Sequence, residues 1–151
     1  MSDVTISPVT RPFAATITPP GSKSMTNRAL VLAALATGPS TLSNILFADD
    51  TRVMFEALGQ LGFDLDVNQP NRSVTLIGRA GAIPFPAAKL LCGNSGTTLR
   101  FLTALCALGR GEYILDGVAR MRQRPIGELS FSSRPPWLTT LRQTFRNPVV
   151  G

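Results

Sequence analysis

The chain is 151 residues long and 44% hydrophobic, which suits one ordinary domain, or part of a larger one, and argues against disorder. It contains no histidine, which excludes Ser-His triads and most zinc sites, and its two cysteines have no metal-ligand spacing, so neither a metal nor a cofactor is expected. The net charge of +6 could suggest a nucleic-acid-binding protein, but three of the six charges fall beyond residue 129, and the other basic residues form no stripe with interleaved aromatics.

Strand and helix patterns alternate along the first half of the chain. In chain order they predict a strand over 14–18, a helix over 24–37, a strand over 40–46, a helix over 51–62 and a hairpin of strands over 63–67 and 73–78. Pro19-Pro20-Gly21 is expected to end the first strand, and Gly38-Pro39 to stop the first helix. Asp49 and Asp50, just ahead of the second helix, are expected to cap it.

The same pattern starts again after Pro84, with a predicted helix over 97–108 and a predicted strand over 112–116. Two pairs of arginines share a spacing of 72 residues (100 − 28 and 124 − 52), namely Arg28 with Arg100 and Arg52 with Arg124. The chain is therefore expected to use one supersecondary unit twice.

The last 22 residues break this repeat. Where the second copy should continue as an amphipathic helix, Pro135 and Pro136 interrupt the pattern, and residues 130–151 contain no Asp or Glu. We expect a tail foreign to the preceding sequence after about residue 129, from a shifted reading frame or a truncation. A true C-terminal segment with a short apolar face is the alternative, and the coding DNA past codon 129 distinguishes the two.

The stretch PPGSKSMTNRAL, residues 19–30, puts small, hydroxyl and basic residues at the predicted start of a helix. A cap explains one serine, Ser22 or Ser24, but neither Lys23 nor Arg28. A helix N-terminus already attracts anions through its free N–H groups and its dipole, so a cation there is destabilising unless an anion offsets it. An ordinary cap and an anion-binding site both remain open for this motif.

Two further motifs carry similar chemistry. GNSGTTLR, from Gly93 to Arg100, opens the second-copy helix, and Gly96 leaves room for a ligand close to the backbone. RMRQRPIG at 120–127 holds three arginines, whose guanidinium groups suit carboxylates and phosphates. A capping turn and a solvated charged loop are the ordinary alternatives, but three such clusters point to a substrate with more than one negative group.

The motifs PGSKSMTNRAL, GNSGTTLRFL and RMRQRPIGEL, in this order and at these separations, resemble those of the EPSP synthase family from about residue 7 to residue 129. The resemblance implies an α/β fold, a partial lobe of the two-domain enolpyruvyl transferase fold, whose βαβαββ repeats form an inside-out α/β barrel. Residues 21–129 would be about one and a half repeats of one lobe. Residues 1–20 would pack on the other lobe, and residues 130–151 would be a non-family tail.

The resemblance also implies a reaction. Family members transfer the enolpyruvyl group of phosphoenolpyruvate to the 5-hydroxyl of shikimate 3-phosphate, by addition and then elimination, and release phosphate. The implied phosphoenolpyruvate contacts are Lys23, Gly96 and Arg124. The implied shikimate 3-phosphate contacts are Lys23, Ser24 and Arg28, and further candidate contacts are Asn94, Asp49 and Arg100.

In family members the catalytic carboxylates lie beyond the position of residue 151, so the chain is expected to be an incomplete and inactive fragment. Gly96 implies a glyphosate-sensitive pocket, although the second motif departs from its commonest form at Ser95, Thr98, Leu99 and Phe101. The alternatives are a nucleic-acid-binding basic protein or a non-catalytic remnant that holds an anion through Lys23, Arg28 and Arg124.

The expected partners are the two small-molecule substrates, without nucleic acid or membrane, and the full-length form is expected to be a monomer. No apolar run reaches the roughly 18 residues of a membrane span, and the N-terminus lacks the pattern of a secretory or transit peptide, so we expect a cytoplasmic protein. Cys92 and Cys106 lie in apolar surroundings and are expected to be reduced and buried.

Overall fold

The computed structural model of the protein describes residues 3–124 and the backbone of residues 140–143. Its elements in chain order are α1 (Lys23–Leu35), β1 (Thr37–Leu42), α2 (Asp49–Gln60), β2 (Leu65–Asn68), β3 (Ser73–Arg79), β4 (Ala87–Leu91), α3 (Gly96–Cys106), β5 (Glu112–Asp116), α4 (Ala119–Arg122) and β6 (Thr140–Gln143). The three predicted helices, the predicted hairpin and the predicted strand over 112–116 are confirmed, with small shifts of their ends.

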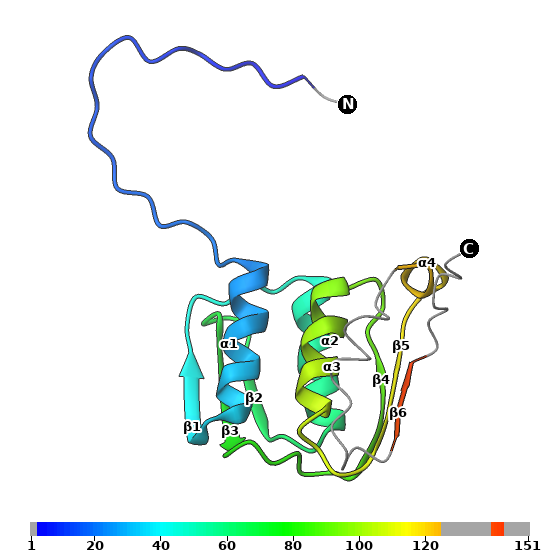
Figure 1. The fold of residues 1–151 in the computed structure, drawn as a ribbon. Helices are drawn as coiled ribbons and strands as arrows, with labels where there is room; N and C mark the ends of the chain where they lie inside the picture. The colour runs from blue at the N-terminus through cyan, green and yellow to red at the C-terminus, as the bar shows by residue number, and fades with distance from the viewer. Residues whose placement is uncertain (1–2, 125–139, 144–151) are drawn as a thin grey trace.

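Helices α1, α2 and α3 lie side by side between two small sheets (Figure 1). One sheet has the order β1-β3-β2, with both pairs antiparallel, and the other has the order β4-β5-β6, with both pairs parallel. Parallel neighbours need a crossover connection, and α3 supplies it between β4 and β5. The predicted α/β class is confirmed.

One hydrophobic core fills the space between the helices and the sheets. Each helix contributes apolar side chains at three- and four-residue spacing, which places them on one face: Leu30, Ala33 and Ala34 from α1, Met54, Ala57 and Leu58 from α2, and Leu99, Leu102 and Leu105 from α3. In β3, Val74 and Leu76 alternate with half-buried residues, which is the period of a strand with one face on the core. The three helices are thereby fixed with their first turns close together.

The predicted strand over 14–18 is wrong. Residues 3–20 form an extended segment that leads away from the body, and their side chains are exposed (Figure 1). A strand is stabilised by hydrogen bonds to its neighbours, and no strand among the described residues pairs with this segment. A local β pattern therefore did not suffice to form a strand.

The ends of the first helix and of the next strand also differ from the prediction. α1 ends at Leu35 because Ala36 takes an extended conformation, and Gly38 and Pro39 lie inside β1 rather than stopping the helix. Proline is tolerated there because β1 is an edge strand of its sheet. β1 ends at Leu42, earlier than predicted, and Asn44 follows with a left-handed φ of 53°.

Strand β4 was not predicted. It pairs in parallel with β5, from Ala87 opposite Glu112 to Leu91 opposite Asp116. The repeat contained the necessary signal, because adding the spacing of 72 to the range 14–18 gives 86–90, almost the bounds of β4. The second copy of the unit therefore has this strand in a sheet, whereas the first copy leaves it unpaired.

The predicted tail lies mostly outside the described residues. Of residues 130–151 only the backbone of β6 is described, which pairs with β5 from Thr140 opposite Glu112 to Gln143 opposite Leu115. The tail after residue 129 and the interrupted helix at Pro135-Pro136 stay predictions.

Both cysteines are free and buried, as expected. Burial, together with the nearby Asp116 carboxylate, raises the pKa of Cys92 to about 12. Burial, together with Cys92, also raises the pKa of Cys106. Because the thiolate is the reactive form, neither residue is a nucleophile at neutral pH.

Candidate anion-binding site

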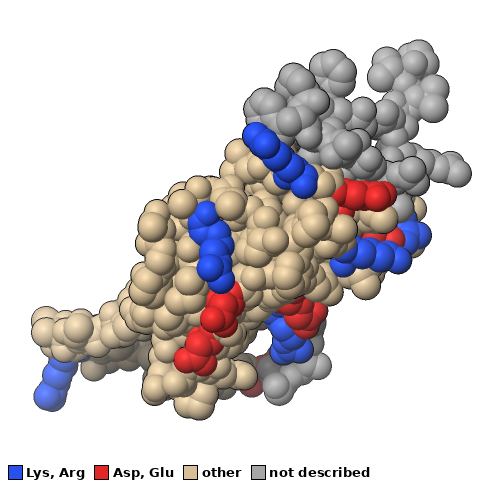
Figure 2. All heavy atoms as spheres, turned by 90° about the horizontal axis from the view of Figure 1, so that it is seen from below, with Lys and Arg blue, Asp and Glu red and all other residues tan. Residues whose placement is uncertain are grey.

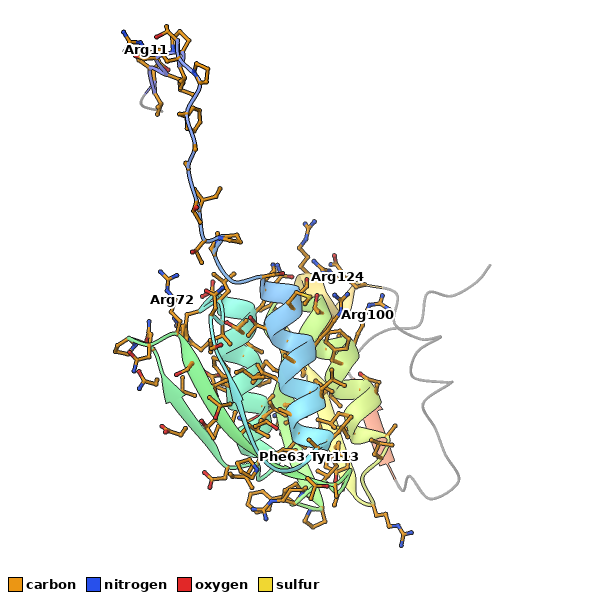
Figure 3. The ribbon with its side chains drawn as sticks, turned by 90° about the vertical axis from the view of Figure 1, so that its left-hand side faces the viewer. Arg11, Phe63, Arg72, Arg100, Tyr113 and Arg124 are labelled. Atoms are coloured by element: carbon orange, nitrogen blue, oxygen red, sulfur yellow. The ribbon has the colours of Figure 1, made fainter. Side chains whose placement is uncertain are left out.

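A cavity of about 750 Å³ opens at the end of the body where α1, α2 and α3 begin. Figure 3 shows Arg100 and Arg124 at this end, and Phe63 and Tyr113 at the opposite one. The lining residues are Lys23, Asp49, Asp50, Asn94, Gly96, Thr97, Arg100, Phe101 and Arg124. Six of the predicted site residues are among them, so segments far apart in the sequence meet in one place.

The first turns of three helices face this pocket, and two are capped by serines. The Ser22 hydroxyl accepts a hydrogen bond from the Met25 N–H at 3.4 Å, and the Ser95 hydroxyl accepts one from the Thr98 N–H at 3.3 Å. Most N–H groups of a first turn have no partner within their own helix, and the helix dipole adds positive potential there. The ends of α1 and α3, which have no acidic residue in their first turns, favour a bound anion, whereas the end of α2 carries two aspartates.

Asp49 and Asp50 do not cap α2, contrary to the prediction. The cap position is Ala48, whose N–H donates to the Thr51 hydroxyl at 2.9 Å, and the two aspartates are the first residues of the helix. Their charge is favourable there because it faces the positive end of the helix dipole. Both aspartates are among the residues that line the pocket.

Lys23 forms an ion pair with Asp50, with Nζ 2.7 Å from Oδ2. The cation at the start of α1 is therefore offset by an acid from α2, which the sequence did not indicate. The side chain of Lys23 is 51% exposed and that of Asp50 is 23% exposed, so solvent screens the pair and it stays accessible to a ligand. A bound anion would share Lys23 with Asp50 or take its place.

Arg124 reaches back over the start of α3. A Cβ built on Gly96 would lie 2.6 Å from Nη1 of Arg124, closer than real Cβ contacts allow. Only glycine lets the guanidinium approach the α3 backbone in this way. Arg124 has no ion pair with any residue that the structure describes, so its charge is directed at the pocket.

Helix α4 sets the position of Arg124. Met121 is fully buried and anchors the helix to the core, and the Arg124 N–H donates to the Met121 carbonyl at 3.0 Å. The Val118 N–H donates to the carbonyl of Gly93 at 3.0 Å, which ties α4 to the loop before α3. The loop and the arginine are thus held against each other by backbone contacts.

An ion pair stabilises the same turn. The buried Asp116 carboxylate, at the end of β5, accepts hydrogen bonds from Arg122 Nε at 2.8 Å and Nη2 at 2.6 Å, and from the Gly117 N–H at 2.7 Å. This two-pronged contact raises the pKa of Arg122, chiefly through the hydrogen bonds. Arg122 is therefore a structural member of the RMRQR cluster, and Arg124 is the one that lines the pocket.

Two predicted site residues do not line the pocket. Ser24 is half-buried and Arg28 is exposed, both on α1. Successive residues of an α-helix turn by about 100°, so Ser24 points away from the direction of Lys23, and Arg28 lies more than one turn further along. The two residues are four apart and so share a face of α1 that differs from the face of Lys23.

The sequence reasoning also missed pocket residues. Asp50 was expected to cap α2 rather than to titrate, and Thr97 and Phe101 were not assigned to a site. The last two follow Gly96 and Arg100 by one residue each, so a helical projection of α3 from Gly96 would have grouped them. The ion pair of Asp50 joins two helices and has no local sequence pattern.

Two negative findings concern the described residues alone. Within them, no three His, Cys, Asp or Glu groups gather closely enough to hold a metal ion. No helix in the same part of the chain is both long and apolar enough to cross a membrane.

Comparison with known proteins gives consistent matches. The family model described as EPSP synthase (3-phosphoshikimate 1-carboxyvinyltransferase) matches residues 9–132. The chain is 50% identical over 129 residues to a 3-phosphoshikimate 1-carboxyvinyltransferase of Nostoc punctiforme, which covers 85% of this chain and 30% of that protein. A Rhizobium leguminosarum protein of the same name is 42% identical over 147 residues, 97% of this chain and 34% of its own length.

Solved structures agree with the sequence matches. A structure of EPSP synthase from Acinetobacter baumannii superposes with a TM-score of 0.71 and 26% identity, over 78% of this chain and 26% of that one. The chain thus spans about a third or less of the length of these relatives. The family model covers most of the chain and all three motifs that line the pocket, and the chain therefore belongs to the EPSP synthase family.

Proposed function

We propose that this chain carries the anion-binding part of an enolpyruvyl transfer site, which in a complete protein would transfer the enolpyruvyl group of phosphoenolpyruvate to shikimate 3-phosphate. The observation that carries the proposal is the pocket at three helix N-termini, into which Lys23 and Arg124 bring positive charge from opposite ends of the described sequence. Phosphoenolpyruvate has a carboxylate and a phosphate, and such a pocket suits both groups.

The donor substrate would lie between Lys23, Gly96 and Arg124. The guanidinium of Arg124 can bind two oxygens of one anionic group, while the ammonium of Lys23 acts as a point charge. The Arg124 guanidinium lies against the backbone at Gly96, so a ligand that it binds would also lie near the free N–H groups of the first turn of α3. Asn94, Asp49 and Arg100 line the same cavity and would complete its polar contacts.

The acceptor substrate would lie beside this pocket, along α1. Ser24 and Arg28 lie four residues apart on one face of the helix that carries Lys23, so Lys23 would stand between the two substrates. Holding two anions in one place is costly without such charges, and preorganised positive groups lower the cost of bringing the reacting atoms together. Gly96 keeps the pocket open to a small competing anion such as glyphosate.

The exposed N-terminal segment would cover another part of the full-length protein. Residues 3–20 carry large apolar side chains in water, namely Val4, Ile6, Val9, Phe13 and Ile17. Apolar groups gathered on an unpaired segment are typical of a contact surface. We propose that this segment packs on a second lobe and that residues 21–129 belong to the first.

The wider assignment is a cytoplasmic, monomeric enzyme whose partners are small molecules rather than nucleic acid. Figure 2 shows the face opposite the pocket end, on which the Lys and Arg side chains are scattered and several lie beside acidic ones. A nucleic-acid-binding face would instead present a continuous basic stripe.

Titration of the purified chain with phosphoenolpyruvate tests the proposal. Arg124→Ala and Lys23→Ala are expected to weaken binding about tenfold or more, as for the loss of a charged hydrogen bond. Arg110→Ala is the matched control, because it removes one exposed positive charge from the loop between α3 and β5. If all three substitutions weakened phosphoenolpyruvate binding equally, the binding would be non-specific charge attraction and the proposal would fail.

A further inference from the structure

We propose that Thr98 is a positioning residue of the pocket, because its hydroxyl joins the N-terminal halves of α1, α2 and α3. The inference rests on the proposed function of that pocket, but it concerns a residue that does not line it. Thr98 is fully buried on the side of α3 that faces the other two helices.

The Thr98 hydroxyl uses its complete hydrogen-bonding capacity. Oγ1 accepts a hydrogen bond from Asn27 Nδ2 at 3.1 Å and another from the Ser95 hydroxyl at 2.8 Å. It donates its own hydrogen to the backbone carbonyl of Asp50 at 3.1 Å. A hydroxyl has one hydrogen and two lone pairs, so all three bonds are compatible and none is spare.

Each of the three partners adjoins a pocket residue. Asn27 lies on α1 one turn after Lys23, and Ser95 is the cap immediately before Gly96. Asp50 is itself the ion-pair partner of Lys23. The partners Asn27 and Asp50 are 71 and 48 residues away in sequence, so one side chain sets the mutual placement of three distant segments.

Asn27 depends on this contact. Its side chain is fully buried, and its Oδ1 has no hydrogen-bond partner among the described residues. The bond from Nδ2 to Thr98 therefore anchors the amide. Removing the Thr98 hydroxyl would leave a buried amide, a buried serine hydroxyl and a backbone carbonyl with one bond fewer each, and buried polar groups without partners are costly.

Thr103 provides a matched control on the same helix. It is also fully buried, but its hydroxyl donates to the carbonyl of Leu99, one turn earlier in α3, at 2.8 Å. Thr98→Val and Thr103→Val thus remove the same hydroxyl from the same helix at the same burial. Only the first removes hydrogen bonds to α1 and α2.

The test compares both variants, and Thr98→Ser, in the full 151-residue chain. Thr98→Val is expected to weaken phosphoenolpyruvate binding roughly three- to tenfold, Thr103→Val to leave it within a factor of about two, and Thr98→Ser to restore it. Amide hydrogen exchange without ligand should become roughly threefold or more faster in the second turns of α1 and α2, where the N–H groups are bonded within the helix, in Thr98→Val only.

The two readouts separate this inference from the proposed function. If the unmodified chain does not bind phosphoenolpyruvate, the proposed function fails, and the exchange comparison alone decides the role of Thr98. Equal exchange and equal binding in Thr98→Val and Thr103→Val would overturn the inference. If Thr98→Val does not fold, Asn27→Ala replaces it, and exchange is then expected to become faster in the second turn of α1 and to stay unchanged in α2.

Discussion

The guanidinium of Arg124 occupies the space into which any side chain at residue 96 would project, with Nη1 2.6 Å from the position of a Cβ on Gly96. The two residues are brought together by the tie between α4 and the loop before α3. Because the obstructing atom is the tip of a flexible side chain, a larger residue at 96 displaces the arginine rather than the backbone.

Gly96→Ala is therefore expected to weaken phosphoenolpyruvate binding about tenfold without loss of stability. Alanine favours a helix over glycine by up to about 1 kcal/mol, so the melting temperature should hold or rise. The effect on binding should vanish in the background of Arg124→Ala, because no guanidinium remains to be displaced. Titration of the four variants of this cycle measures the coupling, and independent effects would contradict the contact.

Asp50 competes with a bound anion for Lys23, so Asp50→Asn is expected to strengthen phosphoenolpyruvate binding severalfold. A part-exposed ion pair contributes about 0–1 kcal/mol, so stability should change little. Glu56→Gln, an exposed position on the same helix, makes the same change of charge outside the pocket and serves as the control. Weaker binding in Asp50→Asn would mean that the carboxylate itself contacts the ligand.

Stability should fall as the pH rises above about 9. The pKa of Cys92 increases from 9.0 to about 12 on folding, so between these values the unfolded chain has lost a proton that the folded chain keeps, and unfolding is favoured. Burial also raises the pKa of Cys106 and of Tyr113, which adds to the same trend. Denaturant unfolding at pH 8 and pH 10.5 measures the loss, and Cys92→Ala should reduce it.

Truncation of two leucines of α1 should change the free energy of unfolding by very different amounts. Leu30 is fully buried, and Leu30→Ala is expected to cost about 2–5 kcal/mol. Leu32 is 67% exposed, and Leu32→Ala should change stability by less than about 0.5 kcal/mol. Denaturant unfolding provides both values, and a large loss for Leu32→Ala would show that this face of α1 is covered in solution.

The isolated chain is expected to bind its substrates without turning them over. General acid–base catalysis contributes about 10²–10⁴-fold, and the family resemblance places the carboxylates that would supply it outside these residues. Phosphate release from phosphoenolpyruvate and shikimate 3-phosphate should therefore stay at the uncatalysed level. Turnover that disappears in Arg124→Ala would contradict this expectation.

Much of the fold was accessible from local sequence patterns. The hairpin of β2 and β3 and the three long helices have clear periodicity, and the serine at each of two helix starts does cap its helix. Residues 14–18 show why such patterns are not sufficient, because a strand also needs a neighbour elsewhere in the chain. The sequence pattern of β4 is weaker, but β4 has β5 as a neighbour in its sheet and does form a strand.

The candidate site also has a part that the sequence predicts and a part that it does not. Lys23, Gly96 and Arg124 belong to recognisable motifs and do meet in one cavity. The ion pair of Lys23 with Asp50 and the contacts of Thr98 join separate helices, so no sequence window contains them. Helix rotation turns Ser24 and Arg28 away from the direction of Lys23, which a list of motif residues does not express.

A pocket assembled from the starts of three helices and Arg124, just after α4, cannot persist in a partly unfolded chain. Any ligand that fits it binds the native state alone and stabilises that state by mass action, by about 2.7 kcal/mol at a hundred times the dissociation constant. Phosphoenolpyruvate bound in this pocket would thus favour folding, and the rise in melting temperature with ligand concentration would report its affinity for the native state.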